Sequence, residues 1–490
     1  MSEPATDQRY FLRLAGEFSI KSRRTQQRFR KQLLRNVGDA LESAGGRFDI
    51  EDRWSRIHVR ADSSDAASHL ARVFGIGSLS RIDRTVPAEL DEIVRAGSEL
   101  YADVVRGRTF AVRARRSGTH AFRSKEIEIA LGAELDAHAK VDLSNPDVTV
   151  GVEVRDELAH FFSSRVAGAG GLPLGVEGRA LALVSGGYDS AVAAWLMLKR
   201  GVDLDYVFCN LGGDAYERSV LAVMKVLADR WSYGSQPRIH VVPFEAVVDH
   251  LRERTVEKYW QVLLKRAMYR TASGLAAGHE ALVTGEAVGQ VSSQTLPNLR
   301  AIEPAAALPV FRPLIGFDKD EIIARARTIG TADLSARVKE YCAIAPGRPV
   351  TAATVEAVDG QEARMDPAVL EAALAEVRTL GLRDLTATDL VAPYLFTADV
   401  PAGATVLDCR SESDFARWHL DGARLVDDWE LERGLGELDR DATYVLYCEQ
   451  GVRTAQIAER MQRAGFEAYS FRGGAPALRR WVEAGTAPAP

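Results

Sequence analysis

The stretch Ala180-Leu-Ala-Leu-Val-Ser185-Gly-Gly-Tyr-Asp-Ser190 decides how the middle of this chain folds. Its first five residues are apolar and predict a buried β-strand, and the apolar run 191–198 predicts a helix. The two glycines between them allow a tight turn in which successive backbone N–H groups point at one anion. Because the start of a helix also attracts negative charge, the stretch predicts a phosphate-binding loop.

Three polar side chains define the chemistry of this loop. Ser185 and Ser190 add hydroxyl donors. Asp189 would be repelled by a phosphate unless a metal ion lay between them, so the loop indicates Mg²⁺. No Gly-Lys pair occurs in the chain, which excludes a Walker A loop. The alternative at this point is an ordinary strand-to-helix turn that binds nothing.

Apolar segments along the chain indicate the fold class. Predicted strands lie at 10–14, 56–59, 110–115 and 148–154 before the loop, at 204–210, 238–243 and 281–284 after it, and at 405–408 and 443–447 near the end. Strands that alternate with helical segments after the loop are typical of a parallel α/β sheet. We therefore expect a multidomain protein that combines α/β and α+β folds.

Composition narrows the class of protein. The chain has 490 residues, 46% hydrophobic and 27% charged, which is typical of a soluble globular protein of several domains. No apolar run approaches the roughly 20 residues of a membrane span, and 1–7 lacks the apolar core of a signal peptide. Four cysteines are too few for a disulfide framework and none form a Cys-x-x-Cys pair. We expect a cytoplasmic protein with no membrane partner and no tightly bound protein metal.

Charge is unevenly distributed along the chain. The formal net charge of −6, read alone, argues against a nucleic-acid partner. However, seven basic residues and no acidic residue lie in 21–35, and the same holds for 106–125. A solvated sheet face is the simplest explanation for any single arginine, but two such segments near the N-terminus together favour a surface that binds a polyanion.

One of the four cysteines lies in a pattern that suggests chemistry. The loop Cys448-Glu-Gln-Gly451-Val-Arg453 follows a predicted strand and precedes a predicted helix, so its backbone N–H groups and the helix start would stabilise an anionic sulfur. Cys342 lies outside any strong strand or helix pattern. Cys209 and Cys409 lie in predicted strands, where a cysteine more often acts as a small apolar side chain.

Several of these motifs resemble known families. The pattern of 185–190 matches the Ser-Gly-Gly-x-Asp-Ser loop of the PP-loop ATP pyrophosphatases, which cleave ATP between the α and β phosphates and adenylate a carbonyl-type oxygen. Other stretches closely resemble the tRNA 4-thiouridine synthase (tRNA sulfurtransferase) family: Leu211-Gly-Gly213, Leu264-Lys265-Arg266, Leu282-Val-Thr-Gly-Glu286-Ala-Val-Gly-Gln290-Val-Ser-Ser-Gln294-Thr295, Arg312-Pro-Leu-Ile-Gly-Phe-Asp-Lys319 and Glu340-Tyr-Cys342. The loop at 448–453 resembles the active-site loop of rhodaneses, with supporting matches at 407–410, 419–423 and 472–474.

The resemblance implies a domain order. A ferredoxin-like domain is expected at 1–75, a THUMP RNA-binding domain at 76–167, a PP-loop domain with a parallel sheet at 176–350, a helical linker at 351–400 and a rhodanese-like domain at 401–490. Asp366 and Pro367 suit the start of one helix in the linker, and Gly381 suits its end.

The resemblance also implies site residues, by position in this sequence. The expected ATP contacts are Leu183, Val184, Ser185, Gly186, Gly187, Ser190, Phe208, Cys209, Lys265, Gly285 and Gln294, with Mg²⁺ as the accompanying ion. The expected catalytic residues are Asp189, Lys319, Cys342 and Cys448, and Gly451 and Arg453 complete the persulfide loop. Cys448 would carry a persulfide, and Cys342 would then form a transient disulfide with it.

The function implied is ATP-dependent sulfur transfer to the uridine at position eight of tRNA. A cysteine desulfurase would supply the sulfur, and a cellular reductant would reopen the disulfide. The family also supplies sulfur for the thiazole of thiamine in many bacteria, which implies the thiamine-thiazole sulfur carrier protein as a further partner. Two alternatives stay open: a persulfide carrier for thiazole synthesis with vestigial tRNA binding, and an ATP-dependent tRNA binder that does not thiolate.

Overall fold

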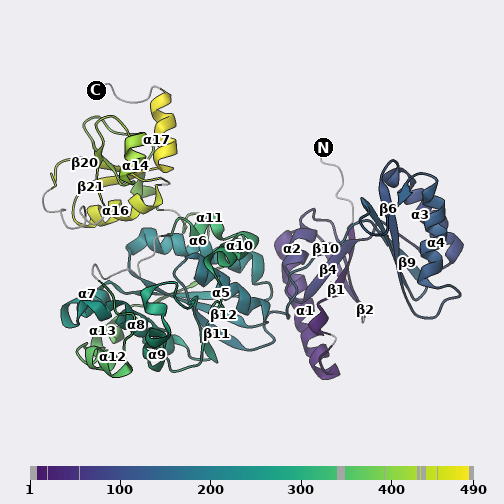
Figure 1. Cartoon of the computed structure of the whole chain (residues 1–490), viewed down its shortest axis with the longest axis horizontal. Coiled ribbons are helices and arrows are strands. Elements are labelled where there is room, and N and C mark those ends of the chain that lie inside the picture. Colours follow the sequence, from purple (N-terminus) through teal and green to yellow (C-terminus); the bar gives the residue numbers. More distant parts are fainter. Residues whose placement is uncertain are drawn as a thin grey trace. The chain divides into compact units, whose positions relative to one another are not determined.

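Figure 1 shows the computed structural model of the chain, which describes residues 8–18, 20–53, 56–338, 348–390, 392–427, 431, 438–449 and 451–484. Within these residues the strands form four sheets. The sheets divide between two compact units, one made of 1–176 with the short segments 199–201 and 233–235, and one made of the rest of the chain. No helix in the described part of the chain is both long and apolar enough to cross a membrane.

The first unit begins with an antiparallel sheet in the order β10-β4-β1-β3-β2. Its elements are β1 (Gln8–Leu14), α1 (Arg23–Ala44), β2 (Phe48–Arg53), β3 (Arg56–Ala61), α2 (Ala66–Arg72), β4 (Ile76–Arg81) and the edge strand β10 (Val166–Ala167). Helix α1 starts at the N-cap Ser22 and buries Phe29 and Leu33 in the core. This is the expected ferredoxin-like order. Strand β4 pairs with β1, so the sheet continues past the expected boundary at residue 75.

The second sheet of this unit has the order β5-β9-β8-β6-β7. Its elements are β5 (Arg84–Pro87), α3 (Leu90–Val105), β6 (Thr109–Ser117), α4 (Ser124–Asp136), β7 (Lys140–Val141), β8 (Val148–Arg155) and β9 (Leu158–Phe162). Strands β6 and β8 are parallel, and Phe110 and Val112 of β6 lie in the core. Arg113 and Arg115 alternate with them and are exposed. The predicted alternation is therefore observed from Val112 to Arg115, whereas Ala111 is buried as well.

The second unit contains a six-stranded sheet in the order β15-β14-β11-β12-β13-β16. Its elements up to residue 335 are β11 (Arg179–Leu183), α5 (Tyr188–Lys199), β12 (Asp203–Asn210), α6 (Gly213–Trp231), β13 (Arg238–Pro243), α7 (Glu245–Arg254), α8 (Trp260–Leu275), β14 (Ala281–Val283), α9 (Leu296–Ile302), β15 (Val310–Phe311), α10 (Lys319–Ile329) and α11 (Ala332–Ser335). Strands β11, β12 and β14 are parallel neighbours and are buried along almost their whole length. Their carboxyl ends therefore meet at one edge of the sheet, where the predicted phosphate loop begins.

The sequence predicts a linker with one helix at 351–400, but the structure contains further elements in this segment. It contains α12 (Val355–Glu362), α13 (Pro367–Ala375) and β16 (Arg378–Gly381). Asp366 caps α13 as predicted, but the helix ends at Ala375 because Gly381 closes a strand that pairs with β13. Side chains from both helices, including Val358 and Ala373, lie in the core of the six-stranded sheet. The part up to Gly381 thus packs with the PP-loop sheet.

The chain ends in a parallel sheet in the order β17-β21-β20-β18-β19. Its elements are β17 (Phe396–Thr397), β18 (Thr405–Asp408), α14 (Glu412–Arg417), β19 (Arg424–Leu425), β20 (Thr443–Tyr447), α16 (Val452–Arg463), β21 (Glu467–Phe471) and α17 (Gly474–Glu483). Successive residues of the central strand β20 enter two different cores, Leu446 on one face and Val445 on the other. The carboxyl end of this buried strand presents Cys448.

Candidate active sites

The loop between β11 and α5 forms the turn that the sequence predicts. Gly186 has a φ of 75°, a left-handed conformation that favours glycine, so the chain turns sharply there. The Ser190 hydroxyl accepts the N–H of Ser185 at 3.3 Å and donates to the carbonyl of Gly187 at 3.2 Å. Ser190 therefore closes the loop onto the first turn of α5, which holds the loop N–H groups in position for an anion.

Asp189 and Lys319 form a charged pair next to this loop. The Lys319 ammonium donates to both carboxylate oxygens of Asp189, at 2.9 and 3.0 Å, and the side-chain amide of Gln290 donates to one of them at 2.7 Å. Lys319 is the first residue of α10, and a capping box between Asp318 and Glu321 fixes where that helix starts. The structure thus brings together two predicted catalytic residues that lie far apart in the sequence.

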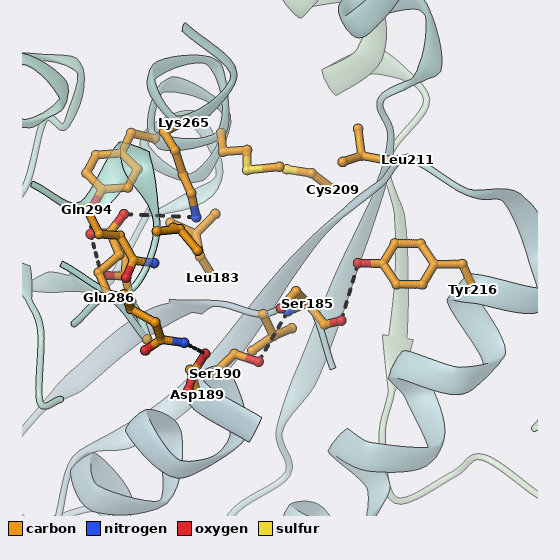
Figure 2. A pocket seen from close by; sticks show the side chains of 17 residues that line it. Leu183, Ser185, Asp189, Ser190, Cys209, Leu211, Tyr216, Lys265, Glu286 and Gln294 are labelled. Carbon is orange, nitrogen blue, oxygen red and sulfur yellow. Dashed lines mark hydrogen bonds and ion pairs between the residues drawn. The ribbon is translucent and has the colours of Figure 1, made fainter. Parts of the chain in front are cut away.

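A pocket opens beside the loop, at the carboxyl ends of β11, β12 and β14 (Figure 2). Residues of the predicted ATP set that line it are Leu183, Val184, Ser185, Ser190, Cys209, Lys265, Gly285 and Gln294. Asp189 lines it as well, and Leu211 and Met268 extend its apolar wall. A lining that combines polar groups with apolar side chains is typical of a site for a small molecule with a charged group.

Three residues of the predicted ATP set do not line this pocket. Gly186 and Gly187 form the turn itself, and Phe208 is fully buried behind the pocket. The ring of Phe208 packs edge-on against Tyr216, with ring centroids 4.9 Å apart, and the Tyr216 hydroxyl donates to the carbonyl of Ser185 at 3.3 Å. The Phe208 side chain therefore supports the wall of the pocket through Tyr216.

Gly285 allows the end of β14 to approach the start of α5. A Cβ atom at this position would lie 2.7 Å from the carbonyl carbon of Asp189 and 2.7 Å from the nitrogen of Ser190. Both are backbone atoms and cannot rotate away. The shape of the pocket therefore depends on the absence of a side chain at Gly285.

Gly285→Ala is expected to lower the free energy of unfolding by about 1–3 kcal/mol, because the added methyl group overpacks a tight contact. It should also weaken ATP binding at least about tenfold, since the phosphate loop has to shift. Denaturant unfolding and calorimetric titration with ATP measure the two effects. Gly316→Ala is the matched control, because nothing lies within 4 Å of a Cβ atom there. Unchanged ATP affinity in Gly285→Ala would contradict the steric argument.

Glu286 lies in the wall of the pocket, where its side chain is 2% exposed. Its Oε2 atom accepts hydrogen bonds from Tyr269 at 2.6 Å, Thr284 at 3.0 Å and the Arg312 guanidinium at 2.9 Å. Burial raises the pKa of this carboxyl, but the charge of Lys265 and the bonds from Tyr269 and Arg312 outweigh burial, so its pKa lies below the ordinary value. The carboxylate is therefore ionised at neutral pH.

Sequence reasoning did not assign a role to several residues of this pocket. They include Tyr269, Thr284, Glu286 and Gln290, and no role was assigned to Arg312 either, which donates to Glu286 from outside the pocket lining. Glu286 and Gln290 lie within the stretch 282–295 that carries the family resemblance, so that stretch contained a signal. Arg312 begins the stretch 312–319 in the same way, and Tyr269 lies four residues after the predicted contact Lys265 on α8, so helical periodicity places both on one face.

Cys448 follows β20 directly and is 6% exposed. The N–H of Gly451 donates to its sulfur at 3.2 Å, and the Thr454 hydroxyl donates to it at 3.6 Å. Gly451 has a φ of 79° and is the N-cap of α16, so the sulfur lies at a helix start. The sulfur thus has a loop N–H donor and lies at a helix start, which is the arrangement that the sequence predicts. Arg453, on the first turn of α16, is exposed.

The other cysteines have different settings. Cys209 and Cys409 are buried in the cores of their sheets, and Cys209 also lines the pocket. Cys342 lies outside the described residues, and so does the predicted pairing of Cys342 with Cys448. Among the described residues there is no group of three or more His, Cys, Asp or Glu side chains placed to hold a metal ion. Asp189 offers the type of oxygen ligand that Mg²⁺ prefers when it accompanies a phosphate.

Comparison with known proteins agrees with these features. The family model described as "Thiamine biosynthesis protein (ThiI)" matches residues 175–366, and a model of its ferredoxin-like domain matches 10–80. The THUMP domain model matches 87–162 and the rhodanese-like domain model matches 396–480. A tRNA sulfurtransferase of Pyrobaculum aerophilum is 38% identical over 93% of this chain and 95% of its own, and one of Desulfurococcus amylolyticus is 36% identical over 97% and 99%.

The chain belongs to the tRNA sulfurtransferase family. A bacterial member, from Marinobacter nauticus, is 36% identical over 93% of this chain and 97% of its own. Among solved structures, a 4-thiouridine synthetase in complex with RNA and bound ATP matches with a TM-score of 0.66 and 31% identity, over 76% of this chain and 99% of that chain. The predicted fold class, with ferredoxin-like, THUMP, PP-loop and rhodanese-like domains, is confirmed.

Proposed function

We propose that this protein is an ATP-dependent sulfurtransferase that converts the uridine at position eight of tRNA to 4-thiouridine. The observation that carries this proposal is that two features occur in one chain. The first is a phosphate loop with the Asp189–Lys319 pair, and the second is a cysteine whose sulfur accepts a backbone N–H at a helix start. The first can activate an oxygen by adenylation, and the second can hold the sulfur that replaces it.

The pocket residues suit ATP. The apolar wall that contains Leu183 and Cys209 would flank adenine, and the N–H groups of the loop would bind phosphate. Lys265 lines the same pocket and supplies a cation for a phosphate. Asp189 would exchange its Lys319 partner for the Mg²⁺ that accompanies ATP, which leaves the Lys319 ammonium free to meet the reacting phosphate. When bound, Mg²⁺ supplies positive charge that stabilises the departing pyrophosphate.

Adenylation is required because a carbonyl oxygen is a poor leaving group. The uridine O4 atom attacks the α-phosphorus, pyrophosphate departs, and O4 becomes part of a good leaving group. The terminal sulfur of a Cys448 persulfide then attacks C4 and AMP leaves, so the base is joined to Cys448 through an S–S bond. A Cys342 thiolate attacks the Cys448 sulfur, which releases 4-thiouridine and leaves a Cys342–Cys448 disulfide. A cysteine desulfurase reloads Cys448 after a cellular reductant has opened that disulfide.

The RNA partner would contact the first unit. Arg24, Arg28 and Lys31 are exposed on α1, and Arg113 and Arg115 are exposed on β6. The 4-thiouridine synthetase of known structure is a complex with RNA, which supports the same partner here. Phosphate contacts by such side chains recognise a structured RNA mainly by its shape and charge.

Binding of tRNA by the full chain is expected to weaken steeply as salt rises, because bound cations of the RNA are displaced. Replacing Arg24, Arg28 and Lys31 together by glutamine should lower the slope of log affinity against log salt by about 2, since each phosphate contact contributes about 0.7–0.9. Filter binding between low and physiological salt measures the slope. Replacing the exposed Arg327, Arg364 and Arg480 of the second unit makes the same charge change and should leave the slope unaltered. An equal effect of both sets would refute an RNA surface on α1.

The proposed activity is tested by mass spectrometry of nucleosides from tRNA incubated with the protein, ATP, Mg²⁺ and a persulfide donor. The expected result is 4-thiouridine at position eight and release of AMP and pyrophosphate in equal amounts. Absence of 4-thiouridine together with ATP and tRNA binding would favour the alternative of a tRNA binder that does not thiolate.

A second candidate function is supply of sulfur for the thiazole of thiamine. The description of the family model that matches 175–366 favours it. This role needs the Cys448 persulfide and not the phosphate loop, with the thiamine-thiazole sulfur carrier protein as acceptor. If Asp189→Ala supplies thiazole sulfur normally while tRNA thiolation is lost, both roles operate in one chain. If thiazole supply needs Cys448 and tRNA thiolation does not, the chain is a carrier.

A further inference from the structure

The pocket contains a buried acceptor that forms an ion pair but receives no hydrogen bond from the described residues. The Oε1 atom of Glu286 is buried and has no hydrogen-bond partner within the part of the chain that the structure describes. The Lys265 ammonium is 4.0 Å from it, which is beyond hydrogen-bond distance. Buried carboxylate oxygens nearly always have donors, so an exception in the wall of a pocket points to a donor on a ligand.

The rest of the carboxylate is held rigidly. Three donors on Oε2 come from three parts of the chain: Tyr269 from α8, Thr284 directly after β14 and Arg312 from the segment after β15. These bonds prevent the carboxylate from rotating, so Oε1 stays on the side of Lys265, as Figure 2 shows. The charge of Lys265 and the bonds from Tyr269 and Arg312 keep Glu286 ionised, and an ionised carboxylate accepts hydrogen bonds and cannot donate them.

We propose that Oε1 of Glu286 accepts the N3–H of the target uracil and takes that proton during adenylation. This inference rests on the proposed function, because it assigns a residue to the uracil in that reaction. The inference goes beyond the proposed function because it names the protein group that recognises the reacting edge of the uracil base.

The position of Oε1 next to Lys265 favours the uracil over ATP as the source of the donor. Lys265 is the cation proposed to meet a phosphate, and the uracil O4 atom has to reach the α-phosphate to react. In uracil, N3 and O4 are both bonded to C4. A base whose O4 atom reaches the α-phosphate therefore brings its N3–H group close to the same place. The phosphates of ATP carry no donor at neutral pH, and its adenine is expected against the apolar side chains of Leu183 and Cys209. When the flexible Lys265 side chain moves to a phosphate, Oε1 becomes accessible to the uracil.

The proton transfer balances the first chemical step. A lone pair of O4 forms the bond to the α-phosphorus, and the bond from that phosphorus to the bridging oxygen breaks as pyrophosphate leaves. The electron pair of the N3–H bond becomes the second bond between N3 and C4, and the proton passes to Oε1. Bonding of O4 to phosphorus makes N3–H far more acidic, so a carboxylate whose pKa lies below the ordinary value can still take the proton. When sulfur adds to C4, the proton returns to N3. It leaves N3 again as AMP departs, and N3 is protonated once more when cleavage of the S–S bond releases 4-thiouridine.

Glu286→Gln in the full chain tests this proposal, because glutamine keeps the shape and removes the charge. We expect the dissociation constants for ATP alone and for tRNA to change less than threefold. We expect tRNA-dependent release of pyrophosphate in a single turnover at pH 7 to fall by about 10²–10⁴-fold, the usual size of a lost acid–base group. The rate of the variant should then rise about tenfold per pH unit up to the ionisation of uracil N3, while the wild type changes little, because hydroxide replaces the missing base.

Two further variants serve as controls. One tests whether the effect comes from the lost negative charge alone, and the other is used if Glu286→Gln does not fold. Glu303→Gln removes the same charge from the other side of Arg312, outside the pocket, and should release pyrophosphate at the wild-type rate with the wild-type pH profile. If Glu286→Gln does not fold, Glu286→Asp keeps the acid on a shorter side chain, and should give an intermediate rate without the added pH dependence.

Three results would overturn the proposal: a wild-type rate in Glu286→Gln, a slow rate with the wild-type pH profile, or ATP affinity lowered more than tenfold. Lowered ATP affinity would mean that Oε1 instead binds ATP or positions Lys265. If the wild type itself releases no pyrophosphate in response to tRNA, the proposed function fails instead.

Discussion

Cys448→Ser is expected to abolish sulfur transfer while leaving uridine adenylation intact. Serine fits the space after β20 and its hydroxyl can still accept the N–H of Gly451. An oxygen in this position cannot carry the transferable sulfur atom, so formation of 4-thiouridine should fall below about one thousandth of the wild-type rate, as for other lost nucleophiles. Quantification of 4-thiouridine in tRNA measures the first effect, and tRNA-dependent pyrophosphate release in a single turnover measures the second.

The matched control for this variant is Cys409→Ala, which removes a buried cysteine of the same domain from outside the loop. Mass spectrometry after exposure to a persulfide donor should find one added sulfur atom on the wild type and on Cys409→Ala, and none at position 448 in Cys448→Ser. Thiolation by Cys448→Ser at a rate close to that of the wild type would mean that sulfur reaches C4 without a persulfide on this loop.

Asp189→Asn is expected to give the opposite pattern. The carboxylate accepts two bonds from Lys319 and one from Gln290 at the edge of the phosphate loop, and it is the proposed contact to Mg²⁺. Asparagine keeps the size but removes the charge, so pyrophosphate release should slow at least about a hundredfold, the usual effect of losing one group that stabilises charge in a transition state. Loading of Cys448 with sulfur should stay normal.

Gln290→Ala provides the comparison for Asp189→Asn. It removes one hydrogen bond to the same carboxylate without changing its charge, so its effect on pyrophosphate release should be smaller than tenfold. Thermal unfolding of both variants should resemble that of the wild type, because a partly exposed ion pair such as Asp189–Lys319 contributes about 1 kcal/mol or less. If Asp189→Asn adenylates at the wild-type rate, the phosphate loop is not the activating site.

The two chemical motifs were predictable because their physics is local. The turn at Gly186 and the one at Gly451 each join a buried strand to a helix within a few residues, so strand, turn and helix start can be recognised in the sequence. The alternation of Phe110 and Val112 with Arg113 and Arg115 is local in the same way. Such patterns depend on strand and helix periodicity, which neighbouring residues determine.

The segment after residue 350 shows where local patterns fail. Asp366 and Pro367 predicted the start of α13 correctly, since capping needs only adjacent residues. Its end at Ala375 and the strand β16 depend on pairing with β13, more than a hundred residues away. Burial of Val358 and Ala373 in the same core then makes this segment part of the six-stranded sheet.

By itself, the sequence determined the fold class, the phosphate loop and the cysteine loop. Only the tertiary structure decided which side chains share the pocket. Lys319 reaches Asp189 from 130 positions away, and Glu286 receives donors from α8, the residue directly after β14 and the segment after β15. The physical reason is that parallel strands bring their carboxyl ends to one edge whatever their separation in the chain. An acceptor without a donor, such as Oε1 of Glu286, is recognised only when all of its neighbours are known.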